Sequence, residues 1–324
     1  MTKALILGIS GQDGSYLSEF LLGKGYQIDG AVRDMHATPD PASAAWRRDV
    51  ELLPWNPLDG HSIRDLLALR RPNEIYNLAA PSSGAGMFDD AMGQGEATGM
   101  AVTRILEAIR IVDPGIRFVQ ASSSELFGEP SCSPQTENTS FLPRSPYGAA
   151  KLYAHSMVRI YRQRYGLFAC SAILFNHESP RRRLEFVSRK VTHAAASIKL
   201  GLSDKLQLGD LDARRDWGFA ADYARAMWLM LQNAKAEDYV IATGKTHSVR
   251  ELCECAFAHV GLDYRSYVRE DLRERRPAET FALVGNPEKA KRELGWVAET
   301  GFDELIRMMV NADLKLLSGK SKAN

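Results

Sequence analysis

The chain has 324 residues, of which 45% are hydrophobic and 25% are charged, as in a globular protein with a substantial core. Its 41 basic and 40 acidic residues leave a formal net charge of +1, so bulk charge indicates no nucleic-acid partner. The sequence shows no signal peptide and no apolar stretch of membrane length, and we expect a cytoplasmic protein without a membrane partner.

The N-terminal stretch predicts a dinucleotide-binding βαβ unit. The apolar run 4–7 reads as a strand buried on both faces, and a G-x-x-G-x-x-G segment follows at Gly8–Gly14. A helix is expected over 15–23 and a second strand over 28–32. Glycines at these points allow a tight turn and a close approach to a pyrophosphate, which lies at the helix N-terminus.

The residues after the second strand leave the choice of dinucleotide open. Arg33 favours the 2′-phosphate of NADP, whereas the adjacent Asp34 favours the ribose hydroxyls of NAD. Both cofactors therefore remain possible at this point.

Hydrophobic periodicity predicts the remaining elements. Further strands are expected at 74–80, 117–121, 169–175 and 239–242. Helices are expected at 101–110, 187–200, 220–231, 249–259, 287–294 and 302–314. The four cysteines show no disulfide framework, and Cys253 and Cys255 are too close together for an ordinary zinc half-site, so we expect no metal.

Candidate catalytic residues come from two segments. Tyr147 and Lys151 are four residues apart, on the same side of one predicted helix, where a lysine ammonium would lower the pKa of the phenol. Ser123 and Glu125 follow the strand at 117–121, at the edge where open α/β sheets carry their chemistry. This combination suits proton removal from a sugar hydroxyl.

These patterns predict an α/β fold: a Rossmann-type doubly wound parallel sheet with a smaller C-terminal α/β lobe that binds substrate. The dinucleotide-binding domain is expected at 1–175 plus about 219–246. The substrate lobe is expected at about 176–218 and 247–314, with a frayed tail at 315–324.

Sequence segments from nearly the whole chain carry a resemblance to a known family. They include GISGQDGSYLSEFLL, EIYNLAA, ASSSELFGE, PRSPYGAAKLYAH, ILFNHESPRR and LGDLDARRDWGFAADYARAMWLMLQ. The chain resembles the GDP-mannose 4,6-dehydratases, within the extended short-chain dehydrogenase/reductase family.

The resemblance implies a hydro-lyase that oxidises the sugar at C4, eliminates water across C5 and C6, and returns the hydride to C6. It implies Tyr147 as the base at C4, Lys151 as its electrostatic partner, Ser123 as a hydrogen-bonding group and Glu125 as the base at C5. It also implies NADP as the cofactor, with NAD possible because of Asp34.

Binding residues follow from the same resemblance. The cofactor would contact Gly8, Gly11, Gln12, Asp13, Gly14, Arg33, Asn56, Leu78, Ala80, Tyr147, Lys151, Asn176, His177 and Arg182. The GDP-sugar would contact Ser82, Ser83, Glu125, Asn176, Lys190, Arg215, Arg276 and Glu279.

The departures from the family pattern gather around the hexose and the adenosine end of the cofactor. They comprise the stretches 34–36, 56–57 and 80–84, a glycine-rich stretch at 90–98, and Arg183 in place of a glycine. They leave open a related substrate such as a GDP-manno-heptose.

Two other functions remain open, namely a GDP-4-keto-sugar reductase or epimerase and a non-catalytic nucleotide-sugar-binding paralogue. The resemblance further implies a homodimer or homotetramer.

Overall fold

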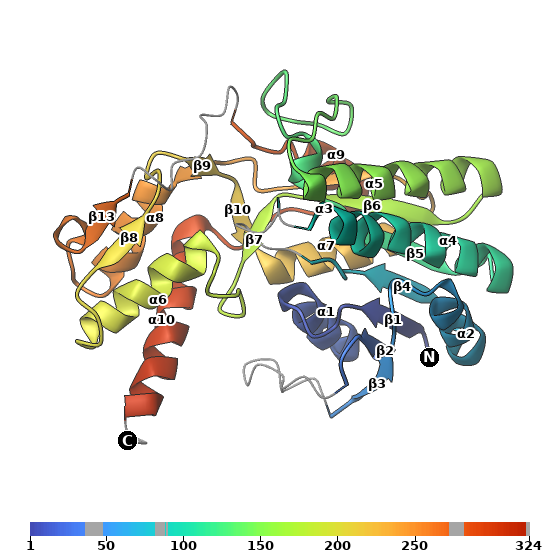
Figure 1. Ribbon diagram of the computed structural model, residues 1–324, viewed down its shortest axis with the longest axis horizontal. Helices are drawn as coiled ribbons and strands as arrows, with labels where there is room; N and C mark the ends of the chain where they lie inside the picture. Colours follow the sequence, from blue (N-terminus) through green and yellow to red (C-terminus); the bar gives the residue numbers. More distant parts are fainter. Residues whose placement is uncertain (36–47, 82–87, 89, 272–281, 322–324) are drawn as a thin grey trace.

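A seven-stranded parallel sheet forms the centre of the protein (Figure 1). The computed structural model describes residues 1–35, 48–81, 88, 90–271 and 282–321. The strand order is β11-β6-β5-β4-β1-β2-β3, and every neighbouring pair is parallel. The strands are β1 (Lys3–Leu7), β2 (Gln27–Val32), β3 (Val50–Pro54), β4 (Glu74–Asn77), β5 (Arg117–Ala121), β6 (Ala169–Leu174) and β11 (Tyr239–Ile241).

Helices cover both faces of this sheet (Figure 1). The side chains of β1 show why: Ala4 and Ile6 join one hydrophobic cluster, whereas Leu5 and Leu7 join the cluster on the other face. Helices α1 (Gln12–Gly23) and α7 (Ala220–Gln232) pack in the first cluster. Helices α2 (Gly60–Arg70), α4 (Ala101–Val112) and α5 (Pro146–Tyr165) pack in the second. The prediction of a doubly wound Rossmann-type sheet is confirmed.

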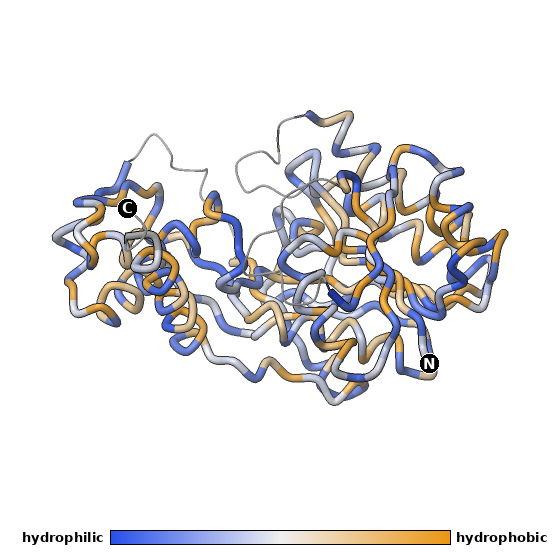
Figure 2. The backbone as a smooth tube through the Cα atoms, turned by 90° about the horizontal axis from the view of Figure 1, so that it is seen from below, coloured by the Kyte–Doolittle hydropathy of each residue, from blue (hydrophilic) through white to orange (hydrophobic). Residues whose placement is uncertain are grey.

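A second group of elements packs beside the sheet around its own core, as Figure 1 and Figure 2 both show. Its helices are α6 (Val187–Lys199), α8 (Val249–His259) and α10 (Phe302–Ser321), joined by the strands β8 (Leu206–Leu208) and β13 (Val268–Glu270). Their shared core contains Val191, Leu252, Phe257 and Met309, each completely buried. Helix α10 continues beyond the predicted end at residue 314, since Ser318 donates a hydrogen bond to the Leu314 carbonyl oxygen.

Short strand pairs connect the two groups of elements. Strand β7 (Asn176–Glu178) pairs in parallel with β10 (Trp217–Phe219), and β9 (Arg214–Arg215) pairs with β12 (His247–Ser248) in antiparallel fashion. The remaining elements are α3 (Ala91–Gln94), η3 (Gly95–Met100), η4 (Ser124–Leu126), η5 (Tyr264–Ser266) and α9 (Glu288–Leu294). The segment η3 is a π-helix in the glycine-rich stretch, a feature that the sequence did not predict.

A buried ion pair fixes the loop between β7 and α6. Arg189 of α6 contacts Asp313 of α10, whose side chain is completely buried, with an N–O distance of 2.5 Å. The same guanidinium donates to the carbonyl oxygens of Pro180 and Arg182, at 2.6 and 2.9 Å. Arg189, whose charge is neutralised by Asp313, therefore holds the backbone of this arginine-rich loop in place.

The turn between β1 and α1 requires glycine at two positions for different reasons. Gly8 has φ of +85°, and an added Cβ would lie 2.9 Å from the backbone of Ala79. A Cβ on Gly14 would lie 2.5 Å from the Cα of Ile9, so the first turn of α1 packs directly on the preceding loop. Both glycines let β4 and α1 approach the turn closely.

None of the helices in the described residues combines the length and the apolar content that crossing a bilayer requires.

Two glycines of α1 provide a matched test of this packing. We expect Gly14→Ala to lower the free energy of unfolding by about 1–3 kcal/mol, because the methyl group meets backbone that cannot yield easily. Gly23→Ala, with nothing within 4 Å of the added Cβ, should raise it by about 0.5–1 kcal/mol. Urea unfolding followed by circular dichroism measures both. Equal effects would contradict the close packing at Gly14.

Candidate active site

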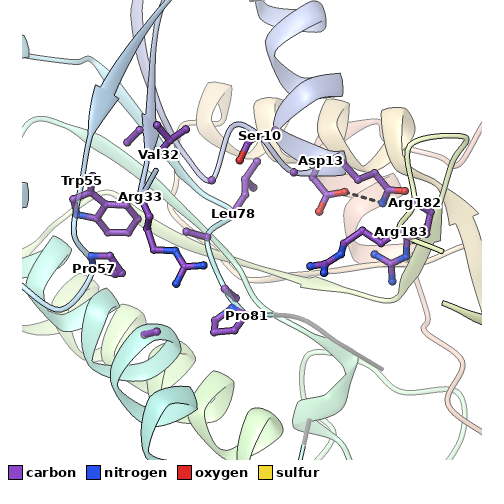
Figure 3. Close-up of a pocket in the computed structure, with 18 of the residues that line it drawn as sticks. Ser10, Asp13, Val32, Arg33, Trp55, Pro57, Leu78, Pro81, Arg182 and Arg183 are labelled. Carbon is purple, nitrogen blue, oxygen red and sulfur yellow. Dashed lines mark hydrogen bonds between the residues drawn. The ribbon is translucent and has the colours of Figure 1, made fainter. Parts of the chain in front are cut away.

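A cavity of about 300 Å³ opens at the carboxyl ends of β1, β2 and β4 (Figure 3). Its walls are the glycine loop, the ends of these strands and the loop before α6. The lining residues are Gly8, Ser10, Gly11, Gln12, Asp13, Gly14, Ala31, Val32, Arg33, Trp55, Pro57, Leu78, Ala79, Ala80, Pro81, Ala97, Arg182, Arg183 and Phe186. A second cavity of about 950 Å³ adjoins it and shares Arg33, Pro57, Ala80, Pro81, Ala97 and Arg183.

The glycine loop fits an anionic group. Gly11 is the N-cap of α1 and provides no side-chain cap for the helix, so the amides of the first turn keep their hydrogen-bonding capacity toward a ligand. The absence of a Cβ at Gly11, where the nearest heavy atom would be 3.4 Å away, leaves room for close approach. The residues present therefore fit the diphosphate of a dinucleotide.

The other end of the cavity fits an adenosine. Arg33 is exposed after β2 and makes no hydrogen bond or ion pair within the described part of the chain. Its guanidinium points into the cavity (Figure 3). Trp55, which follows β3 and is 4% exposed, forms an apolar wall there. Asn56 lines only the second cavity, and its side chain accepts a hydrogen bond from the amide of Leu58 at 3.0 Å.

An ion pair anchors the glycine loop to β7. The Nε2 atom of His177 lies 3.0 Å from Oδ2 of Asp13, and its Nδ1 lies 2.7 Å from the carbonyl oxygen of Phe175. Both ring nitrogens face acceptors, so both donate and the imidazole is a cation. Gln12 strengthens the connection, because its amide donates to the His177 carbonyl oxygen at 3.0 Å.

The two partners shift each other's pKa in opposite directions. Burial alone would raise the pKa of Asp13, but the charge and hydrogen bond of His177, with smaller contributions from Gln12 and Arg182, lower it to about 2. Burial alone would lower the pKa of His177, but the charge and hydrogen bond of Asp13 raise it above 6.5. Both shifts favour the ionised form of the pair.

The candidate catalytic residues converge where α5 begins. Ser145 caps α5 by accepting from the Gly148 amide at 3.0 Å, and Pro146 occupies the first turn. A Cβ on Gly148 would lie 2.7 Å from the carbonyl oxygen of Glu125, so the start of α5 packs against η4. Ser123 hydrogen-bonds the phenol of Tyr147.

The expected effect of Lys151 on Tyr147 is wrong for this structure. Burial, followed by the negative charge of Glu125, raises the pKa of Tyr147 above its ordinary value of 10. The Lys151 amine lies 5.7 Å from the centre of the Tyr147 ring and donates to the carbonyl oxygen of Ala121 at 2.7 Å. It is 3% exposed, and burial lowers its own pKa to about 8. Burial, rather than the lysine, therefore dominates the pKa of Tyr147.

Glu125 has an unusual environment. It is only partly exposed, and its Oε2 atom is buried without a hydrogen-bond partner in the described structure. Unpaired buried carboxylate oxygens are costly and concentrate where a ligand or a reaction needs them. The carboxylate is thus available to a substrate atom beside Tyr147.

The structure brings most of the predicted cofactor residues into one cavity. Nine of them line the first cavity: Gly8, Gly11, Gln12, Asp13, Gly14, Arg33, Leu78, Ala80 and Arg182. His177 joins it through Asp13, whereas Asn176, Tyr147 and Lys151 do not line it. Lys190 and Arg215 are outside both cavities. Ser82, Ser83, Arg276 and Glu279 lie outside the described residues.

Sequence reasoning missed several lining residues, among them Trp55, Ala97 and Phe186. Trp55 could have been found from the rule that strand ends line the site, but the strand at 50–54 was not predicted. Ala97 and Phe186 carry no chemical signal, since only the packing of their helices places them there.

Comparison with known proteins identifies the family. The sequence profile described as GDP-mannose 4,6 dehydratase matches residues 5–309. The chain belongs to the GDP-mannose 4,6 dehydratase family. GDP-mannose 4,6 dehydratase 2 of Arabidopsis thaliana is 47% identical over 327 residues, which cover 97% of this chain and 87% of the relative.

Solved structures share the fold of this family member at low sequence identity. The dTDP-glucose 4,6-dehydratase from Bacillus anthracis, solved in complex with NAD, has a TM-score of 0.84 at 20% identity and covers 97% of both chains. RMD from Pseudomonas aeruginosa, complexed with NADPH, has a TM-score of 0.82 at 22% identity, covering 98% of this chain and 100% of the other.

The ion pair between Asp13 and His177 gives a prediction for pH dependence. Asp13 contributes stability that is present above pH 3.8 and is lost as the pH falls toward 2, whereas the contribution of His177 is present below pH 6.5 and is lost as the pH rises through its raised pKa. We expect Asp13→Asn to lower the free energy of unfolding by about 2 kcal/mol between these limits. It should also lower the pKa of His177 in a proton NMR titration.

The outcome that contradicts this account is specific. A difference in unfolding free energy between the two proteins that stays constant from pH 5 to pH 9, with an unchanged His177 titration, would mean that Asp13 acts only through packing.

Proposed function

We propose that this protein is a GDP-mannose 4,6-dehydratase, a hydro-lyase that forms the 4-keto-6-deoxy sugar. One observation carries the proposal: Glu125 places a buried, unpartnered carboxylate oxygen beside the phenol of Tyr147. Elimination across C5 and C6 needs a base for the C5 proton, which simple oxidation or reduction at C4 does not. The family membership supports the same reaction.

We infer a nicotinamide dinucleotide as the cofactor, and NADP rather than NAD. A bound nicotinamide would supply oxidation at C4 and the later reduction at C6. The glycine loop would hold its diphosphate, and Arg33 would pair with a 2′-phosphate. Asp34 has interactions of its own, which leaves Arg33 as the charged group that points into the cavity at this end.

Tyr147 and Lys151 would share the proton transfer at the C4 hydroxyl. Because the pKa of Tyr147 is raised, the phenol is protonated in the free protein and needs additional positive charge before it acts as a base. Ser123 hydrogen-bonds the phenol oxygen, which lowers that pKa and orients the group. Lys151, whose amine donates to the Ala121 carbonyl oxygen at 2.7 Å, would complete the arrangement.

Glu125 would act after oxidation. A 4-keto group acidifies the C5 proton, which a carboxylate can then remove, and the C6 hydroxyl leaves as water once it is protonated. The free Oε2 atom of Glu125 can accept that proton without breaking an existing hydrogen bond. The cost of keeping this oxygen unpaired is then offset by substrate contact.

We propose that the second group of elements holds the nucleotide sugar. Lys190 is exposed in the first turn of α6, and Arg215 lies on β9, which pairs with β12. Both are suited to phosphate groups of GDP. Ser82, Ser83, Arg276 and Glu279 complete the proposed set, and Asn176 would contact both cofactor and sugar.

The structure favours this function over the two alternatives. A GDP-4-keto-sugar reductase would have no use for a C5 base such as the free carboxylate beside the phenol. A binding protein would not need the close approach of Ser123, Glu125 and Tyr147. The altered residues near the hexose keep a related sugar such as a GDP-manno-heptose as the second candidate substrate.

We further propose a homodimer formed by α4 and α5. Exposed apolar residues gather on these helices, including Ile111 at 57%, Tyr165 at 47% and Ile160 at 45% exposure. Burial of such side chains in a helix bundle would be favourable. A homotetramer would need a second contact.

Incubation of the full chain with GDP-mannose tests the reaction. We expect proton NMR to show a new C6 methyl signal and loss of H4, without net consumption of nicotinamide. Tyr147→Phe and Glu125→Gln should each lower the rate by about 10²–10⁴-fold, since each removes a proton-transfer group. Glu125→Gln keeps the shape of the side chain and should still permit oxidation at C4.

The negative results are informative. No methyl signal with either NADP or NAD added would overturn GDP-mannose as the substrate. A methyl signal from a GDP-manno-heptose would then assign the reaction to the related sugar. Unchanged rates in Glu125→Gln would remove this carboxylate from the mechanism.

The cofactor preference gives a separate prediction. We expect Arg33→Ala to weaken NADP binding about 10-fold or more and to leave NAD binding nearly unchanged, because only NADP has the 2′-phosphate that this cation would contact. Titration with each dinucleotide measures the two affinities. Equal loss for both would place Arg33 elsewhere along the cofactor.

A further inference from the structure

Three consecutive arginines follow β7, and the structure gives them different surroundings. Arg181 donates to Glu19 of α1 at 2.7 Å and lies over the ring of Tyr16 at 4.0 Å, so it joins the loop to α1. Arg182 lies 3.1 Å from Glu178 and 3.5 Å from the ring centre of Phe186. Both guanidinium groups are thus engaged by the protein.

Arg183 differs from its two neighbours. Its ion pair is with Glu185 at 3.3 Å, and the side chains are 72% and 38% exposed. An exposed pair of this kind contributes little to stability and exchanges readily for another anion. Arg183 lines both cavities, and Figure 3 shows its guanidinium directed into the space between it and Arg33.

The backbone at Arg183 is held in place although its side chain is exposed. Its carbonyl oxygen accepts from the Phe186 amide at 3.2 Å, which closes a turn before α6. The preceding residue, Arg182, is fixed through its carbonyl oxygen by Arg189, which is in turn paired with Asp313. The side chain therefore starts from a defined point at the edge of the cavity.

The charges around the cavity leave a place for a dianion. Asp13 is paired with His177, and Glu96 is paired with Arg104 at 2.6 Å, so neither carboxylate competes strongly for Arg183. The glycine loop offers uncapped amides on one side. A cation on the opposite side would complete an anion site that backbone amides begin.

We propose that Arg183 binds the diphosphate of the dinucleotide cofactor, from the side opposite the glycine loop. The proposal rests on the cofactor part of the proposed function and deepens it. Arg33 would then contact the adenosine end and Arg183 the diphosphate, so that two arginines from distant parts of the chain hold one cofactor. Neither Lys190 nor Arg215 lines these cavities, which separates this contact from the proposed GDP contacts.

Binding measurements on the full chain test this assignment without reference to turnover. NADP, NAD and GDP are each titrated against the wild-type protein, Arg183→Gln, Arg183→Lys and Glu185→Gln. We expect Arg183→Gln to weaken NADP and NAD by the same factor, about 10-fold, because both share the diphosphate. Arg183→Lys should recover most of the affinity by retaining the charge, and GDP binding should be unchanged in every variant.

Glu185→Gln is the matched control, since it removes the competing anion and leaves Arg183 intact. It should leave dinucleotide affinity equal to or above that of the wild-type protein. Added salt should reduce the difference between wild type and Arg183→Gln, as expected for an exposed charge.

Several outcomes would overturn the inference. They are unchanged affinities in Arg183→Gln, a loss confined to NADP, which would place Arg183 at the 2′-phosphate, or a loss confined to GDP. Wild-type protein that binds neither dinucleotide would overturn it together with the cofactor assignment. If instead the dinucleotides respond as expected and no 4-keto-6-deoxy product forms, this inference stands and the proposed reaction fails.

Discussion

The ion pair between Asp13 and His177 joins the first turn of α1 to the first strand that leaves the central sheet. Its cation stacks on Tyr223 of α7 with 4.7 Å between ring centres, so three elements meet at one buried charge. Because the carboxylate and the imidazole each favour the charged form of the other, the pair holds the glycine loop against β7, which leads into the loop that carries the arginines. The cavity between them depends on that coupling.

In the candidate catalytic centre, burial shifts the pKa values of single side chains and, among the residues that the structure describes, is not balanced by an ion pair. Ser123, Glu125 and Tyr147 meet because the end of β5 and the start of α5 pack without an intervening side chain at Gly148. Burial raises the pKa of Tyr147 and lowers that of Lys151. Because the pKa of Tyr147 is raised, bound ligands would have to supply additional positive charge before the phenol acts as a base.

The three consecutive arginines 181–183 have different roles in the loop between β7 and α6. Arg181 and Arg182 stabilise the loop through contacts with α1 and with Glu178, and buried Arg189 fixes its backbone from α6. Only with this framework in place can an exposed guanidinium such as Arg183 be directed at a ligand. Three identical side chains are thus distinguished by their partners rather than by their chemistry.

The sequence by itself determined the sheet and the glycine loop, because strand burial and glycine spacing act over a few residues and leave a periodic pattern. It also marked Arg33 and the run 181–183 as candidates. It could not predict β3, the π-helical segment or the wall formed by Trp55, since these depend on packing between distant elements. Only the tertiary structure decided the pKa of Tyr147, because burial outweighs a lysine one helical turn away. Likewise, only the tertiary structure separated Arg183 from its neighbours, because identical charges differ in the carboxylates and aromatic rings that lie within reach and in their exposure.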